Sequence, residues 1–83
     1  MDIKNVTIAG GGVLGSQIAW MIAFHGFNVS VYDKFEPGIN GAKELHKKYA
    51  EHFKANRDAS QEEIEDTFSR LSYTTNLAEA VKD

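Results

Sequence analysis

Residues 10–15 read Gly-Gly-Gly-Val-Leu-Gly, a G-x-G-x-x-G pattern that stands between an apolar run and a segment with helical spacing. In a dinucleotide-binding unit each glycine of this pattern has a separate role. Gly10 allows a tight turn, Gly12 lets a pyrophosphate approach the backbone without meeting a Cβ, and Gly15 permits close packing of helix on strand. The free amides of the first helical turn then face the phosphates. The pattern therefore predicts a strand, a turn and a helix in that order.

The segments on either side of the glycines complete a βαβ unit. Ile3–Ala9 is a short apolar run of the kind found in buried parallel strands. Val13–His25 has the composition and spacing of a helix, and Gly26 follows it as a left-handed C-terminal residue. Phe27–Tyr32 alternates β-branched residues and is predicted to be the second strand.

Within the first predicted helix, Ile18–Phe24 is apolar around its whole circumference, which predicts burial on more than one side. Leu14, Ile18 and Ile22 are four residues apart, and we expect this row to face the sheet. Trp20 and Phe24 are also four apart and lie elsewhere on the helix. Their partners are either later helices of this chain or chain outside it.

An acidic residue ends the second strand. Asp33 follows Gly10 by about 20 residues, the offset at which the dinucleotide fingerprint expects a carboxylate on the adenosine ribose. It would repel a 2′-phosphate by roughly 4 kcal/mol per charge pair at ~4 Å and an effective dielectric of ~20, which favours NAD over NADP, although Lys34 offsets part of this. The predicted cofactor is NAD, and the predicted cofactor-binding residues are Gly10, Gly11, Gly12, Val13, Leu14, Gly15 and Asp33.

Two other interpretations of the glycines stay open. Glycine turns also connect strands to helices where no ligand binds. An FAD-binding unit begins with the same fingerprint, but it usually ends its second strand in Glu. The combination of strand, helix and Asp33 favours the NAD interpretation.

The second half of the chain is predicted to hold two helices before a third strand. Pro37 and Gly38 indicate a turn, and an amphipathic helix follows over 42–54. Ser60 and Glu63 have the S-x-x-E spacing of a capping box that opens the next helix. The remaining predictions are a strand over 71–75 and, after the cap residue Asn76, a short helix over 77–82.

These elements predict an α/β fold: the first half of a Rossmann-type doubly wound parallel sheet, with strands 1–3 and their crossover helices. In the doubly wound order 3-2-1-4, the first strand lies at the sheet edge when no fourth strand is present. We therefore expect residues 1–83 to be the N-terminal part of a dinucleotide-binding domain, with the rest of that domain and a C-terminal helical domain outside this chain.

Composition excludes several classes of function. The 83 residues carry a net charge of −3, which gives no basic surface for nucleic acid, and no apolar run approaches the ~18 residues of a membrane span. The lack of cysteine fits a reducing cytoplasm, where we expect this protein. His46 and His52 are six apart on one predicted helix, so they cannot share a metal, and we expect both to be solvated. Tyr73 shows no partner for acid–base work.

Three blocks of the chain resemble the N-terminal NAD-binding domain of the 3-hydroxyacyl-CoA dehydrogenases, including the 3-hydroxybutyryl-CoA dehydrogenases. The blocks are Val6–Ala19, Val31–Asp33 and Leu71–Asp83. The two-helix segment between strands two and three is more particular to this family than the glycine pattern is. The resemblance implies hydride transfer between NAD and a 3-hydroxyacyl-CoA, with 10–15 and Asp33 as cofactor contacts.

The resemblance also implies parts that this chain lacks. In the family, a catalytic His paired with Glu and a helical dimerisation domain follow the segment matched here. We therefore assign no catalytic residue and expect a homodimer formed through the missing C-terminal domain. The mixed charges of 42–54 show no plainly basic CoA-facing surface, so a relative acting on another hydroxy acid stays open. The alternative function is a non-catalytic NAD(H)-binding module that senses redox state or serves a structural role.

Overall fold

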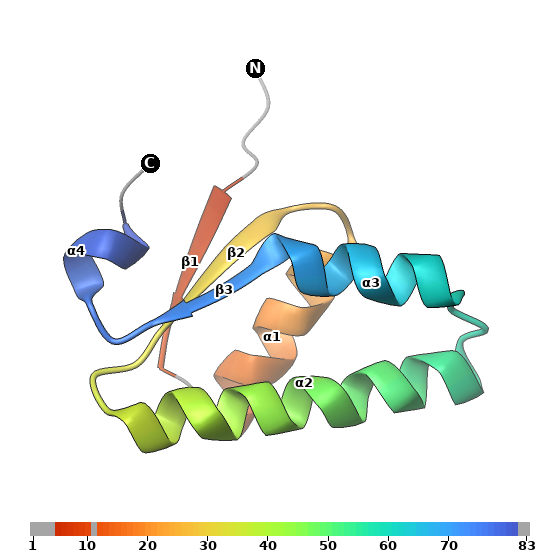
Figure 1. Ribbon diagram of the computed structural model, residues 1–83, viewed down its shortest axis with the longest axis horizontal. Helices are drawn as coiled ribbons and strands as arrows, with labels where there is room; N and C mark the ends of the chain where they lie inside the picture. The colour runs from red at the N-terminus through yellow and green to blue at the C-terminus, as the bar shows by residue number, and fades with distance from the viewer. Residues whose placement is uncertain (1–4, 11, 82–83) are drawn as a thin grey trace.

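The computed structural model describes residues 5–10 and 12–81. Its elements in chain order are β1 (Asn5–Ala9), α1 (Val13–Phe24), β2 (Asn28–Tyr32), α2 (Glu36–Asn56), α3 (Gln61–Arg70), β3 (Leu71–Thr74) and α4 (Leu77–Ala80), as Figure 1 shows. The predicted order of strands and helices is confirmed. Positions 3 and 4 of the predicted first strand and position 82 of the predicted last helix lie outside the described residues.

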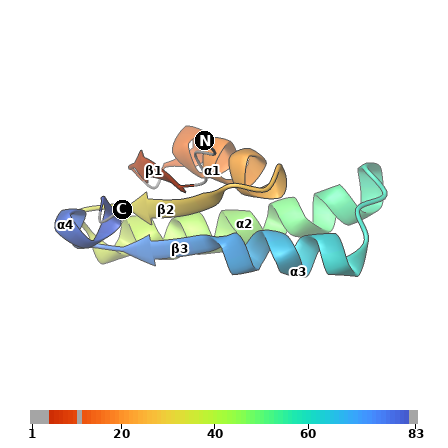
Figure 2. The ribbon, with the colours of Figure 1, turned by 90° about the horizontal axis from the view of Figure 1, so that it is seen from above.

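The three strands form one parallel sheet in the order β1-β2-β3. Within the described residues β1 is therefore an edge strand, as expected from the doubly wound order. Ala9 pairs with Tyr32, so the strands β1 and β2 end side by side. Figure 2 shows that α2 and α3 extend beyond one end of the strands, whereas α4 lies at the other.

The helices cover the sheet unequally. α1 contacts both α2 and α3. In Figure 1, α2 runs below the strands and α3 continues the line of β3. Ile8 lies beneath Gly15 of α1, whereas the neighbouring Thr7 donates from Oγ1 to the carbonyl oxygen of Ala80 in α4, at 2.9 Å. Because successive side chains of a strand point to opposite faces, α4 lies on the face opposite α1.

The prediction of which row of α1 is buried was wrong. Leu14 is 69% exposed and Ile18 is 43% exposed, while the buried residues of the helix are Ser16, Ala19, Trp20 and Ala23. Ile22 lines an open hollow together with Val6 of β1, so the row through positions 14, 18 and 22 follows the edge of the sheet. The residues described there provide no second layer to cover that row.

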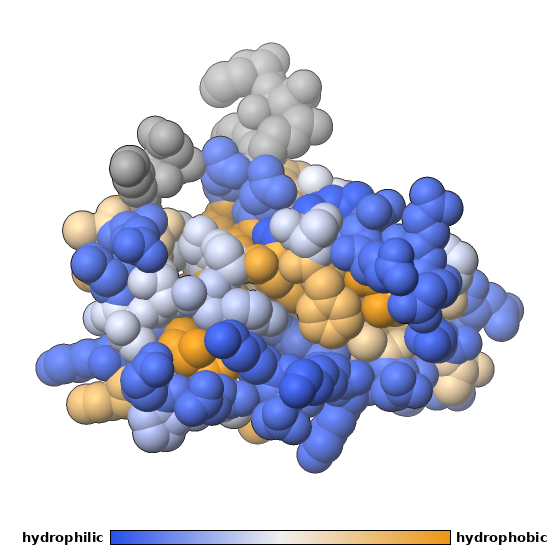
Figure 3. Space-filling view, viewed as in Figure 1, coloured by the Kyte–Doolittle hydropathy of each residue, from blue (hydrophilic) through white to orange (hydrophobic). Residues whose placement is uncertain are grey.

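Trp20 packs on the two-helix segment, which settles the alternative left open for it. Its exposed fraction is 1%, and its ring lies 5.7 Å from that of Phe53 in α2 and 5.2 Å from that of Phe68 in α3. Phe24 makes an edge contact with Phe53 at 4.9 Å. Aromatic pairs with this geometry are stabilising beyond their buried area. Figure 3, viewed as in Figure 1, shows apolar residues in the middle of the molecular surface and hydrophilic residues around them.

The start of α2 differs from the prediction. Pro37 and Gly38 do not form a separate turn but lie in the first turn of the helix, which begins at Glu36. Proline is tolerated there because a first-turn amide has no partner within the helix. The amides of Gly38 and Ile39 both donate to the carbonyl of Phe35.

Two predicted helix caps are confirmed. In the capping box of α3, the amide of Glu63 donates to Ser60 Oγ at 3.0 Å, and the amide of Ser60 donates to Glu63 Oε1 at 2.8 Å. At α4, the amide of Glu79 donates to Asn76 Oδ1 at 3.2 Å. Both caps satisfy amides that the helices leave free. None of the helices formed by residues 5–10 and 12–81 has the length and apolar character needed to cross a membrane.

Candidate functional site

The glycine turn connects the end of β1 to the start of α1. Gly10 has a φ of +98°, a left-handed conformation that favours glycine, and its amide donates to the carbonyl of Tyr32 at 2.7 Å. The turn is thereby tied to the end of β2. Gly11 lies outside the described residues.

Gly12 and Gly15 lack a side chain for different physical reasons. A Cβ at Gly15 would lie 2.5 Å from the carbonyl oxygen of Gly10 and 3.6 Å from Ile8 Cγ2, so the protein's own packing requires glycine there. A Cβ at Gly12 would meet nothing within 4 Å. Packing within the described residues therefore gives no reason for glycine at position 12, and the open space suits the close approach of a ligand.

The first turn of α1 has the properties of an anion-binding site. Gly12 is its N-cap residue, no side chain of the described residues caps the helix, and its first turn holds no acidic residue. Val13 and Leu14, the first helical residues, are exposed. Uncapped amides and the positive end of the helix dipole therefore face outward from the glycine turn. A diphosphate fits this position without needing a cationic side chain.

Asp33 lies at the same edge of the sheet, directly after β2. Its amide donates to the carbonyl of Thr74 at 3.2 Å, and its Oδ1 accepts from the amide of Phe35 at 2.9 Å. A Cβ at Gly38 would fall on the Asp33 carboxylate. The first turn of α2 therefore holds the carboxylate beside the strand ends, and the parallel register places it next to the glycine turn.

A buried histidine lies beneath this edge, and its prediction as a solvated residue was wrong. His46 of α2 has an exposed fraction of 0%. Its Nε2 lies 2.8 Å from the carbonyl oxygen of Ser16, and its Nδ1 lies 2.6 Å from the hydroxyl of Tyr73. A carbonyl only accepts, so Nε2 carries the proton and the Tyr73 hydroxyl donates to Nδ1. Tyr73, for which the sequence showed no acid–base partner, is thus hydrogen-bonded to His46.

Burial keeps both members of this pair neutral. Desolvation lowers the pKa of His46 below its usual 6.5, although its hydrogen bond to the Ser16 carbonyl opposes the shift. Desolvation raises the pKa of Tyr73 from 10.0 to about 12. The pair therefore links α1, α2 and β3 without placing a charge in the interior.

A signal for this burial is present in the sequence. His46 shares three- and four-residue steps with Ile39, Ala42, Ala50 and Phe53, all of which are buried. The prediction relied on the residue type and on the six-residue spacing from His52, and it did not use this row.

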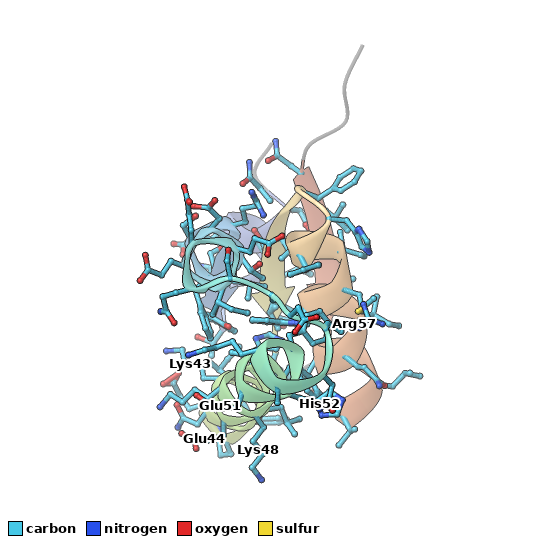
Figure 4. All side chains as sticks on the ribbon, turned by 90° about the vertical axis from the view of Figure 1, so that its right-hand side faces the viewer. Lys43, Glu44, Lys48, Glu51, His52 and Arg57 are labelled. Atoms are coloured by element: carbon cyan, nitrogen blue, oxygen red, sulfur yellow. The ribbon has the colours of Figure 1, made fainter. Side chains whose placement is uncertain are left out.

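The outer side of α2 carries charges of both signs. Figure 4 shows Lys43, Glu44, Lys48 and Glu51 on this helix, with His52 and Arg57 at its side. Lys47 Nζ lies 3.3 Å from Glu44 Oε2. The helix therefore offers no uniformly basic surface, in agreement with its sequence.

A groove of about 450 Å³ lies between α1 and α2. Its lining residues are Gln17, Trp20, Met21, Lys48, Tyr49, His52, Phe53 and Arg57. None of them belongs to the glycine turn or is Asp33, so this groove is distinct from the predicted cofactor site. Among residues 5–10 and 12–81, no three His, Cys, Asp or Glu side chains gather in a way that could hold a metal ion.

The parallel strands, the glycine turn at the start of α1 and the acid after β2 define the first half of a Rossmann-type dinucleotide-binding fold. Residues 5–83 match the family model "3-hydroxyacyl-CoA dehydrogenase, NAD binding domain". The chain belongs to this family, whose cofactor is NAD.

Relatives and a solved structure agree with the family. The chain is 37% identical over 84 residues to the mitochondrial hydroxyacyl-coenzyme A dehydrogenase of Rattus norvegicus, covering 95% of this chain and 27% of that protein. It is 36% identical over 86 residues to a probable 3-hydroxybutyryl-CoA dehydrogenase of Bacillus subtilis, covering 96% and 28%. A diketoreductase structure, described as catalysing reactions of dicarbonyl compounds, matches with a TM-score of 0.90 at 37% identity and covers 100% of this chain and 30% of that one. The chain therefore spans less than a third of the length of these proteins.

Proposed function

We propose that this chain is the cofactor-binding part of an enzyme that transfers a hydride between NAD and a 3-hydroxyacyl-CoA, such as 3-hydroxybutyryl-CoA. The observation that carries the proposal is the convergence of the glycine turn and Asp33 at one edge of the sheet. NAD supplies the hydride acceptor or donor when it is bound. The residues of this chain bind and orient the cofactor, and the groups that act on the substrate belong to chain beyond it.

The cofactor contacts are proposed residue by residue. Gly10, Gly11 and Gly12, together with the amides of Val13 and Leu14, would hold the pyrophosphate. Gly15 keeps α1 close to β1 so that these amides reach the phosphates. Asp33 accepts hydrogen bonds from the adenosine ribose hydroxyls, and its charge disfavours a 2′-phosphate.

The substrate class rests on the relatives rather than on residues of this chain. The rat and Bacillus proteins are named for hydroxyacyl-CoA and 3-hydroxybutyryl-CoA substrates. The diketoreductase, named for dicarbonyl compounds, supports a second candidate in which the substrate is a related hydroxy or oxo compound without CoA. The mixed charges on the outer side of α2 do not favour CoA over such a compound.

The assembly and location of the protein belong to the same proposal. We expect a homodimer formed by a helical domain beyond this segment, as the family resemblance implies. We expect the protein in the cytoplasm, although the rat relative is named as mitochondrial. Size measurement and fractionation of the intact protein test both expectations.

The substitution Asp33→Asn tests the cofactor assignment. Asparagine keeps an oxygen for the Phe35 amide but removes the charge. We expect weaker NADH binding and a preference for NADH over NADPH that narrows by about tenfold or more, which corresponds to ~1.4 kcal/mol. Fluorescence titration of the intact protein with both nucleotides measures this. An unchanged preference ratio would show that Asp33 does not face the ribose.

A turnover assay separates the enzyme from the non-catalytic alternative. The intact protein with NADH and acetoacetyl-CoA, or with a simple diketone, should oxidise NADH with one of the two. NADH binding without turnover of either would support a redox-sensing or structural module instead.

A further inference from the structure

Hydrogen bonds and short stretches of backbone connect the glycine turn to Asp33 through the interior. The amide of Ser16 donates to the carbonyl of Gly12 at 2.8 Å, and the carbonyl of Ser16 accepts from His46 Nε2 at 2.8 Å. His46 Nδ1 accepts from the Tyr73 hydroxyl at 2.6 Å. The next residue, Thr74, accepts from the amide of Asp33 at 3.2 Å.

His46 is the residue of this path that joins separate elements through its side chain. The other steps are backbone contacts within the start of α1 or between the ends of neighbouring strands. The imidazole holds Ser16, in α1, with one nitrogen and Tyr73, in β3, with the other. A change at this ring therefore alters how α1 sits relative to the strand ends.

The packing around His46 leaves its ring little freedom. Its centroid lies 5.8 Å from that of Trp20, 6.0 Å from that of Tyr49 and 5.7 Å from that of Tyr73. A buried ring whose two nitrogens are both hydrogen-bonded holds its partners in one geometry. Ordinary apolar packing at this position would bury the same area without fixing the rotation of α1 about its axis.

We propose that His46 is a positioning residue for NAD, which orients the start of α1 through the Ser16 carbonyl so that the glycine turn and Asp33 engage the same cofactor molecule. This inference rests on the proposed function, because it takes the glycine turn and Asp33 as the cofactor contacts. His46 itself touches no cofactor. Its effect reaches the site through the helix whose first turn faces the pyrophosphate.

Two substitutions of His46 separate its two hydrogen bonds. The side-chain amide nitrogen of Gln reaches the position of Nε2, so His46→Gln keeps a donor for the Ser16 carbonyl. The side chain of Asn reaches only as far as Nδ1, so His46→Asn keeps an acceptor for Tyr73 but loses the contact with α1. Both variants remove the imidazole ring, and Asn leaves the larger cavity. The two are therefore compared by NADH affinity measured well below each melting temperature, where a loss of stability alone does not change the Kd.

The expected result is a difference in NADH affinity between these variants in the intact protein. We expect the Kd of His46→Asn to rise by about tenfold and that of His46→Gln by less than about threefold, as the loss of one buried hydrogen bond predicts. Fluorescence titration well below both melting temperatures measures the Kd, and circular dichroism checks helix content. His52→Asn is the matched control, because His52 lies on the same helix but is exposed and bonds only locally, to Asn56.

The outcomes distinguish this proposal from the proposed function. If the unmodified protein binds NADH and the Asn and Gln variants weaken binding equally, the positioning role is overturned while the function stands. If the unmodified protein does not bind NADH, the proposed function fails. Should His46→Asn not fold, His46→Leu decides: it keeps apolar packing at this position but removes both hydrogen bonds, so a Kd raised by about tenfold supports the proposal and a Kd within threefold of the unmodified value overturns it.

Discussion

The start of α1 and the middle of the same helix are built in opposite ways. At the start, no described side chain caps the amides, Val13 and Leu14 are exposed, and a Cβ at Gly12 would meet nothing within 4 Å. Near the middle, Trp20 is enclosed by aromatic rings and the Ser16 carbonyl is held by a buried histidine. Among the described residues, the first region has no capping partner, whereas the second is packed and hydrogen-bonded within the chain.

This contrast separates residues that the fold requires from residues that a ligand requires. A substitution in the enclosed region costs stability whether or not cofactor is present. A substitution in the open region leaves the fold intact and changes binding. Substitutions in the two regions should therefore differ in whether they change stability or NADH binding.

The largest expected effect is on stability, in the enclosed region. Trp20→Ala removes a ring that is 1% exposed and contacts both α2 and α3, so we expect a loss of about 3–5 kcal/mol in the free energy of unfolding. Leu14→Ala on the same helix is the control, and it should change stability by no more than about 0.5 kcal/mol because Leu14 is exposed. Denaturant unfolding of the intact protein measures both. Equal losses would show that the exposed row of α1 is covered in the intact protein.

A smaller effect on stability is expected from substituting serine at Gly15, with serine at Gly12 as the comparison. Gly15→Ser drives a Cβ against the Gly10 carbonyl and should cost about 1–3 kcal/mol of stability. Gly12→Ser meets nothing and introduces a favourable N-cap, so stability should stay within about 0.5 kcal/mol or rise slightly.

Gly12→Ser should weaken NADH binding even though it does not lower stability. The new side chain occupies the approach to the first-turn amides, so we expect NADH affinity to fall by about tenfold or more. Thermal melting and NADH titration of both variants give the comparison. If the Gly12→Ser protein binds NADH with unchanged affinity, the proposal that the pyrophosphate binds at this turn is wrong.

The smallest expected effect is a dependence of stability on pH. The pKa of His46 is lowered in the folded protein, so the unfolded chain binds more protons below pH 6.5 and stability declines as the pH falls through that value. The pKa of Tyr73 is raised to about 12, so the unfolded chain loses its proton first and stability declines as the pH rises from 10. His46→Gln should weaken the acid dependence and Tyr73→Phe the alkaline one. Melting temperatures measured from pH 5 to 11 would show this, and variants that follow the unmodified curve at both ends would contradict it.

Local signals in the sequence predicted the elements well. The glycine pattern, the Ser60–Glu63 capping box and the cap at Asn76 each depend on a few neighbouring residues, and the structure has the strand order and caps that they indicate. Pro37 was misjudged because proline indicates a turn and a first helical turn equally well.

Which face of a helix is covered could not be predicted in the same way. Spacing shows that Leu14 and Ile18 share a row, but it does not show whether another layer lies over that row. His46 was assigned to solvent on its residue type, although its position in the row with Ala42 and Ala50 indicated burial. Its hydrogen bonds join residues far apart in the chain, and no local pattern encodes them.

The contact between Asp33 and Gly38 has a consequence for engineering the cofactor preference. The carboxylate occupies the space that a side chain at position 38 would need, and the same carboxylate anchors the Phe35 amide at the start of α2. A redesign that exchanges only the acid for a small neutral residue would leave a void and an unanchored amide there. Converting the preference to NADP while keeping α2 intact calls for coordinated replacement of positions 33 and 38.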